Sequence, residues 1–113
     1  MTMNVKPIYV TDNETGMEYT LEFTRESIAF AERKGFEIGD VARFPMTKGY
    51  DLWFYAFRAH HKNLPREKTD GLFDACGGVG NEELLTRLGE LYSVPFEAMR
   101  EDEGENPRVT VRL

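Results

Sequence analysis

The side chains best suited to chemistry in this 113-residue chain are one cysteine, Cys76, and two adjacent histidines, His60 and His61. A thiolate nucleophile needs a nearby base and a group that orients that base. No such set is evident, and Cys76 falls on the apolar face of a predicted helix, which favours a core thiol. Side chains of adjacent helical residues diverge by about 100°, so the histidines do not easily share a metal ion. We therefore expect no catalytic site, no metal site and no bound cofactor.

Two further patterns have some features of ligand sites but lack the defining residues. The turn at residues 11–16 places Asp12 and Glu14 in alternation, yet the full spacing and the terminal glutamate of a calcium loop are missing. The glycine-rich stretch GGVGN at residues 77–81 has no strand before it and no Lys-Ser/Thr pair after it. We interpret the first as a hairpin turn and the second as a turn between helices.

The charge balance narrows the possible partners. The chain has 20 acidic and 14 basic residues, a formal charge of −6, and its basic residues are scattered rather than clustered. Such a chain is repelled by nucleic acid and by anionic membranes. A single cysteine excludes an intrachain disulfide and fits a reducing compartment. With no long apolar run and no apolar signal core in MTMNVKP, the expected location is the cytoplasm.

The elements that must position these side chains follow from hydrophobic periodicity. We predict a central helix over residues 46–62, because its apolar side chains recur at helical spacing: Met46, Tyr50, Trp53, Phe54 and Phe57. Its polar side chains occupy only a narrow stripe, which we expect to face water: Lys48, Asp51, Tyr55, Arg58 and Lys62. A helix that is apolar over most of its circumference must be covered by the rest of the domain or by another chain.

The N-terminal part predicts a β-hairpin followed by a helix. Residues 18–24 alternate between apolar and polar side chains, and residues 8–10 form a shorter β-prone run that should pair with them in antiparallel fashion. Thr24 is suited to cap a helix over residues 25–34. Gly35 is the expected left-handed stop after it.

Further helices are expected after the central one. We predict helices over residues 65–76 and around the leucine-rich stretch 84–92, and a short last helix that begins at residues 93–95. The segment 36–45 reads as an ordered linker or a short helical turn. The predicted fold is therefore α+β: an N-terminal β-hairpin followed by a mostly helical bundle of four to five short helices, in a single globular domain over residues 1–100.

Residues 101–113 change in character. An acidic, glycine-containing linker is followed by RVTVRL, in which apolar and polar residues alternate as in a strand. We expect a flexible C-terminal tail whose end either pairs with the N-terminal hairpin or adds as a strand to another chain.

Several stretches together resemble a known family. They are YTLEFTRESIAFAERKGFEI, the aromatic helix ending in AFRAHHK, ELLTRLGELY, the following VPFEAM and the acidic tail. In order and composition they resemble the small tail assembly chaperones of long-tailed, siphovirus-type bacteriophages and prophages of Gram-positive bacteria. The resemblance covers residues 19–99, and the RVTVRL end departs from it.

The resemblance implies a non-enzymatic protein of the host bacterial cytoplasm that is absent from the mature virion. It implies that the chain binds the tape measure protein, keeps that long helical protein soluble, and helps tail tube assembly, in which the major tail tube protein is a possible second partner. The alternative is an acidic phage-encoded regulatory or inhibitor protein that binds a host or phage protein.

A chaperone of this kind must offer apolar surface, and the aromatic excess of the central helix also predicts a homo-oligomer. Large aromatic residues are the usual binding anchors. The hypothesis for partner binding names two residues of the central helix and four of the C-terminal end: Trp53, Phe57, Phe96, Met99, Val109 and Val111. For Trp53 and Phe57 the competing interpretation is that they belong to the core.

Overall fold

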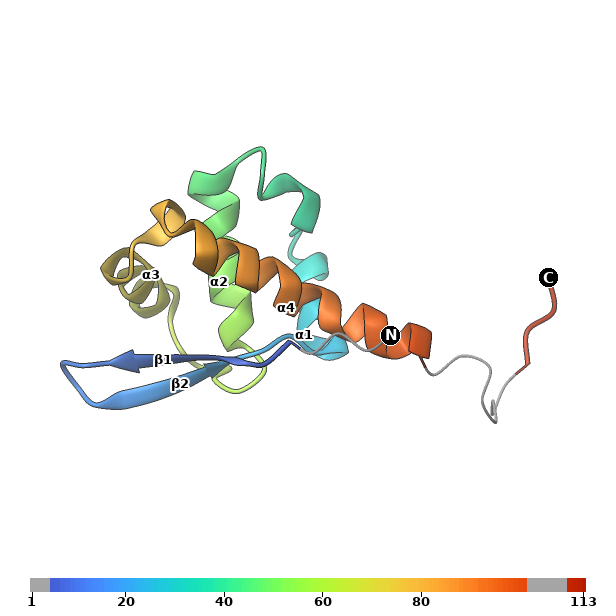
Figure 1. The fold of residues 1–113 in the computed structure, drawn as a ribbon, viewed down its shortest axis with the longest axis horizontal. Helices are drawn as coiled ribbons and strands as arrows, with labels where there is room; N and C mark the ends of the chain where they lie inside the picture. The colour runs from blue at the N-terminus through green and yellow to red at the C-terminus, as the bar shows by residue number, and fades with distance from the viewer. Residues whose placement is uncertain (1–4, 102–109) are drawn as a thin grey trace.

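The computed structural model describes residues 5–101 and 110–113. Within them, an antiparallel hairpin is followed by four helices, and this confirms the predicted α+β fold class (Figure 1). The elements in chain order are β1 (Ile8–Asp12), β2 (Met17–Leu21), α1 (Arg25–Arg33), α2 (Tyr50–Phe57), α3 (Arg66–Ala75) and α4 (Glu82–Glu101). Short helical turns lie at Ile38–Asp40, Pro45–Gly49 and Gly78–Gly80. No helix in the described ranges is long and apolar enough to span a membrane.

The hairpin forms where the sequence predicted it, although its second strand ends at Leu21 and not at residue 24. Ile8 pairs with Leu21 and Asp12 with Met17, and Gly16 takes a positive φ of 77° in the turn. The Asp12 carboxylate accepts the backbone N–H of Glu14 and a 2.7 Å bond from Lys68 Nζ on α3. The hydrogen bond from Lys68, followed by that from the backbone, lowers the pKa of Asp12. The acidic turn is thus a hairpin turn that also ties the hairpin to α3.

Helix α1 begins and ends at the predicted signals. The Thr24 hydroxyl accepts the N–H of Ser27 at 3.0 Å, and the Ser27 hydroxyl accepts the N–H of Thr24 at 2.8 Å, which completes a capping box. Gly35, at φ 89°, ends the helix. The linker that follows contains the short helical turn Ile38–Asp40, as expected.

Helix α2 is central but shorter than predicted. It contacts α1, α3, α4 and β2, yet its regular part spans only Tyr50–Phe57, and the turn before it is a π-helical turn at Pro45–Gly49. The chain is thus helical from Pro45 to Phe57, so the predicted start at residue 46 is close, although its first turn is π-helical, and the predicted end at residue 62 was wrong. Met46 is 68% exposed instead of buried, and after Phe57 the chain turns away toward the hairpin. The contacts between the segment after Phe57 and the hairpin join residues distant in sequence, so the helical period could not reveal them.

The core lies around α2. Trp53 is fully buried, stacks on the Phe73 ring at 4.9 Å, and donates its indole N–H to the carbonyl of Thr69 at 2.7 Å. Phe57 is 1% exposed and packs edge-on against Trp53. Tyr55 was expected in the polar stripe, but it is buried against Phe36 of the linker. The linker thus covers a face of α2 that the periodicity assigned to water.

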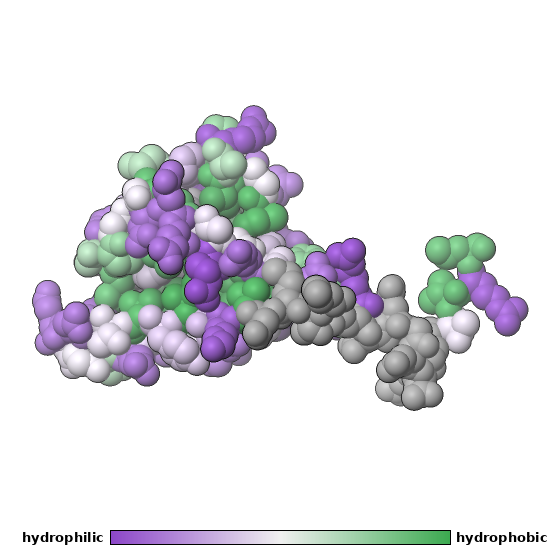
Figure 2. Space-filling model, viewed as in Figure 1, coloured by the Kyte–Doolittle hydropathy of each residue, from purple (hydrophilic) through white to green (hydrophobic). Residues whose placement is uncertain are grey.

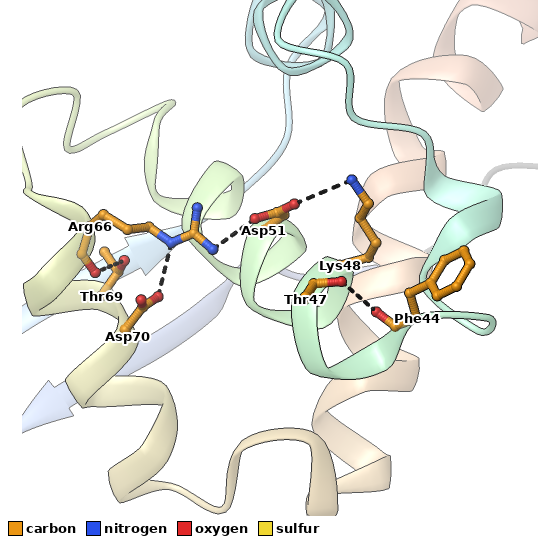
Figure 3. Close-up of polar contacts among 7 residues, drawn as sticks. All are labelled: Phe44, Thr47, Lys48, Asp51, Arg66, Thr69 and Asp70. Carbon is orange, nitrogen blue, oxygen red and sulfur yellow. Dashed lines mark hydrogen bonds and ion pairs between the residues drawn. The ribbon is translucent and has the colours of Figure 1, made fainter.

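A polar network joins α2 to α3 on the outside of this core (Figure 3). Arg66 donates to Asp51 at 2.7 Å and to Asp70 at 2.9 Å, and Lys48 lies 3.8 Å from the other oxygen of Asp51. The Arg66 guanidinium also lies 5.1 Å from the centre of the Phe54 ring. Each charge in the network faces an opposite charge, so the group ties α2 to α3.

Helix α4 is one element of 20 residues, where two helices were predicted. Pro95 lies inside it and lacks the N–H that would bond to the carbonyl of Leu91. The Phe96 ring stays 5.9 Å from the Tyr92 ring, one turn earlier, so packing continues across the proline. At about 1.5 Å per residue the helix is about 30 Å long. Its second half runs beyond the core (Figure 1).

The predicted strand at the C-terminal end is only partly within the described ranges. Residues 110–113 are exposed and lie in no strand, and the described sheet contains β1 and β2 alone. The expectation that this end pairs with the N-terminal hairpin was therefore wrong for residues 110–113. Val109 lies outside the described residues.

Candidate partner-binding groove

Helix α1 and the second half of α4 lie side by side (Figure 1). A hollow lies between their side chains. Its volume is about 220 Å³. From α1 it is lined by Arg25, Ile28, Ala29 and Glu32, and from α4 by Pro95, Phe96 and Met99. Most of this lining is apolar, so the hollow is suited to an apolar side chain from outside.

A second hollow of about 660 Å³ adjoins the first, because Glu32 and Phe96 line both. Its other walls come from α4 and from the linker after α1: Tyr92, Gly35, Phe36, Glu37, Ile38, Gly39 and Asp40. We call the two hollows together the α1–α4 groove. The linker is held in place by Phe36, which is 2% exposed and packs against Tyr55 and Tyr92.

The groove exposes large apolar side chains to solvent. Phe96 is 46%, Met99 56% and Ile38 38% exposed. Phe96 and Met99 are accessible because the second half of α4 extends past the helices that cover its first half. Hydrophobic residues also remain visible between hydrophilic ones on the face seen in Figure 2. In the groove, however, exposed apolar side chains coincide with a concave surface, which is typical of a binding site.

The charges around the groove are asymmetric. Glu37 and Asp40 line only the larger hollow, which has no cation among its lining residues, and Arg25 lines only the smaller one. Glu32 lines both hollows, but it lies in the last turn of α1 whereas Arg25 lies in the first, so the two charges stand at opposite ends of that helix. None of these four side chains forms an ion pair with another described residue. Burial raises the pKa of the Tyr92 phenol, and the negative charge of Glu32 raises it further. The groove therefore has an acidic end and a basic end.

The structure brings two of the six predicted partner-binding residues together. Phe96 and Met99 both line the groove. Trp53 and Phe57 are buried around α2, which agrees with the core interpretation and leaves no accessible surface on either. Val111 is 71% exposed and lines none of the described hollows, and Val109 lies outside the described residues.

The linker side of the groove could not be predicted from the sequence. Ile38 stands between two acidic residues, Glu37 and Asp40, in a segment interrupted by glycine. An isolated apolar residue in an acidic linker is a weak signal of surface function. Only the fold shows that Ile38 lines the same hollow as Phe96.

Cys76 does not occupy a core position. It is exposed at the end of α3, so the prediction of a core thiol was wrong. It is the C-cap residue of α3, and its Sγ donates to the carbonyl of Phe73, one turn back, at 3.3 Å. Partial burial of the sulfur raises the thiol pKa above its ordinary value, which disfavours the nucleophilic thiolate.

The two histidines connect the end of α2 to β2. His60 Nε2 lies 2.6 Å from a Glu22 carboxylate oxygen, and His61 Nε2 accepts the backbone N–H of Thr20 at 3.0 Å. Burial and the neighbouring His60 lower the pKa of His61. Within the described ranges, no three His, Cys, Asp or Glu residues are grouped so that they could hold a metal ion. The histidine pair thus has a structural part in holding the hairpin.

These features define a small α+β protein with an accessible, charge-asymmetric apolar groove between its first and last helices. The chain belongs to the DUF5055 family, a domain of unknown function, which it matches over residues 1–113. No curated protein and no solved structure matches the chain.

Proposed function

We propose that the chain is a non-enzymatic phage tail assembly chaperone that binds the tape measure protein, keeps it soluble and helps tail tube assembly. The observation that carries the proposal is the α1–α4 groove, where Phe96 and Met99 are exposed in a concave apolar surface. The family resemblance of residues 19–99 supports it, since both residues fall in that stretch.

The groove suits a long helical client. A helix that presents an apolar stripe can insert its side chains between α1 and α4, as amphipathic helices do in other grooves. Helix α1 has nine residues, so one groove covers only about 13 Å of a client helix. Several copies of the chain are then needed for one long client, which is consistent with the proposed homo-oligomer. The formal charge of −6 would help keep such a complex soluble. The proposed location is the host bacterial cytoplasm, and the protein would be absent from the mature virion.

The test is coexpression with the tape measure protein of the same gene cluster. We expect that protein to be soluble and to copurify only when the chain is present. A Phe96→Asp/Met99→Asp variant should lose both effects, because it places charge on the apolar groove. The matched control is Tyr9→Asp/Met17→Asp, which changes two apolar hairpin residues that are 63% and 53% exposed.

The control variant should behave like the unaltered chain. If the tape measure protein remains insoluble with the unaltered chain, the chaperone function is wrong. If both variants retain full activity, the function stands and the groove is not its site. Circular dichroism should show that both variants are folded before the comparison is made.

A further inference from the structure

We propose that the α1–α4 groove binds an amphipathic helix in one direction, with a basic N-terminal end over Glu32, Glu37 and Asp40 and a C-terminal end toward Arg25. This inference rests on the proposed function and defines the client segment by its chemistry. It follows from the shape of the groove, its charges and the dipole of any helix that enters it.

The apolar floor sets the kind of partner. Phe96 stands between the two hollows and lines both, so an incoming stripe must place side chains on either side of its ring. A helix does this naturally, because residues three or four apart project from one face. The hollows differ in volume, about 220 Å³ against about 660 Å³. The larger side chain, or a pair of side chains, should therefore enter on the side of Ile38.

Charge complementarity sets the sign of the flanking residues. The three carboxylates lie around the larger hollow without a cation among its lining residues, so they favour lysine or arginine on the partner. Ion pairs at the rim of an interface add little affinity each, but they discriminate between orientations and partners. Arg25, at the other end, favours an acidic residue or a helix C-terminus.

The helix dipole favours the same direction. The N-terminus of a helix carries a partial positive charge and its C-terminus a partial negative charge. A helix with its N-terminus at Glu32, Glu37 and Asp40 and its C-terminus at Arg25 satisfies both ends of the groove. In the reverse direction both ends meet like charge.

The test uses two synthetic 15-residue peptides of identical composition and the full chain. Both carry the same leucine stripe and a hydrocarbon staple on the opposite face, so that both are helical. One has three lysines in its first two turns and three glutamates in its last two turns, and the other has these exchanged. Fluorescence anisotropy at low salt should show about tenfold tighter binding of the first peptide, and the preference should shrink as salt is added.

Substitutions test whether the preference for the first peptide comes from the charges of the groove. The variant Glu32→Gln/Glu37→Gln/Asp40→Asn should bind both peptides with nearly equal affinity. The matched control, Glu18→Gln/Glu82→Gln/Glu83→Gln, removes the same charge elsewhere and should keep the preference. Equal effects of the two variants would attribute the preference to net charge and overturn the inference.

Paramagnetic labels test the direction itself. A nitroxide at the N-terminus of the first peptide should broaden the Ile38 methyl resonances, and one at the C-terminus should broaden the Met99 methyl resonance. The opposite pattern, or equal affinity of the two peptides, overturns the inference. Self-association of the chain that Phe96→Asp abolishes would also overturn the inference, because the groove would then be the binding site of a second copy. If neither peptide binds but the tape measure protein still copurifies, only this inference fails and the chaperone function stands.

Discussion

The core around α2 and the α1–α4 groove are both rich in apolar and aromatic side chains, but only one of them is covered. Around Trp53, each ring meets another ring or a backbone acceptor, and the large side chains are almost inaccessible. In the groove, Phe96 contacts Tyr92 on one side and solvent on the other. Aromatic content alone therefore does not mark a binding surface. What marks it is apolar surface that the chain's own elements leave uncovered.

The largest expected effect is that of Trp53→Ala. Truncation of a fully buried tryptophan leaves a cavity and should lower the free energy of unfolding by about 3–5 kcal/mol. Phe96→Ala is the matched change in the groove and should cost about 1 kcal/mol or less, because that side chain is already half exposed. Urea denaturation followed by circular dichroism measures both. Equal losses would remove the distinction between a covered and an uncovered region.

A smaller effect is expected when the tryptophan is replaced with another aromatic residue. Trp53→Phe keeps a ring against Phe73 but loses the hydrogen bond from the indole to the carbonyl of Thr69. We expect a loss of about 1–2 kcal/mol in the free energy of unfolding, from the missing bond and a small void. A loss as large as that of Trp53→Ala would show that the hydrogen bond, rather than ring packing, holds α2 to α3.

The sequence predicted well the features that depend on neighbouring residues. The Thr24 cap, the Gly35 stop and the hairpin turn are decided within a few residues, so their positions were confirmed. Helix α4 begins after Asn81, whose side-chain oxygen accepts the N–H of Leu84. The α+β fold class then follows from the order of these elements.

Features decided by contacts distant in sequence were not predicted. The early end of α2 depends on bonds between His60, His61 and β2, and the burial of Tyr55 depends on Phe36. The groove needs α1, the linker and α4 together, so the sequence indicated Phe96 and Met99 but not Ile38. Proline in a pattern usually ends a helix, and only the packing across Pro95 shows that α4 continues.

Pro95→Ala should stabilise the second half of α4 without stabilising the first. Alanine restores the N–H that can bond to the carbonyl of Leu91, and it is a better helix former. Because the second half of α4 lies outside the core, the gain should be local: about tenfold slower amide hydrogen exchange over residues 96–100, with little change in the exchange of Leu88. Hydrogen exchange measured by NMR tests this. Equal slowing at Leu88 would mean that both halves unfold as one unit.

The smallest expected effect is a pH dependence at the end of the covered region. In the folded chain, His61 Nε2 accepts the N–H of Thr20, and burial together with His60 lowers the His61 pKa below its ordinary 6.5. The unfolded state then binds a proton more readily than the folded state, so stability is highest above pH 6.5 and falls as the pH drops through the lowered pKa. In His61→Gln, the amide oxygen can still accept from Thr20 but cannot titrate. The difference in urea midpoint between pH 7.5 and pH 5 should therefore be smaller in this variant than in the unaltered chain. If the two differences are the same, other groups cause the acid sensitivity, and His61 does not link the hairpin to α2 in a proton-dependent way.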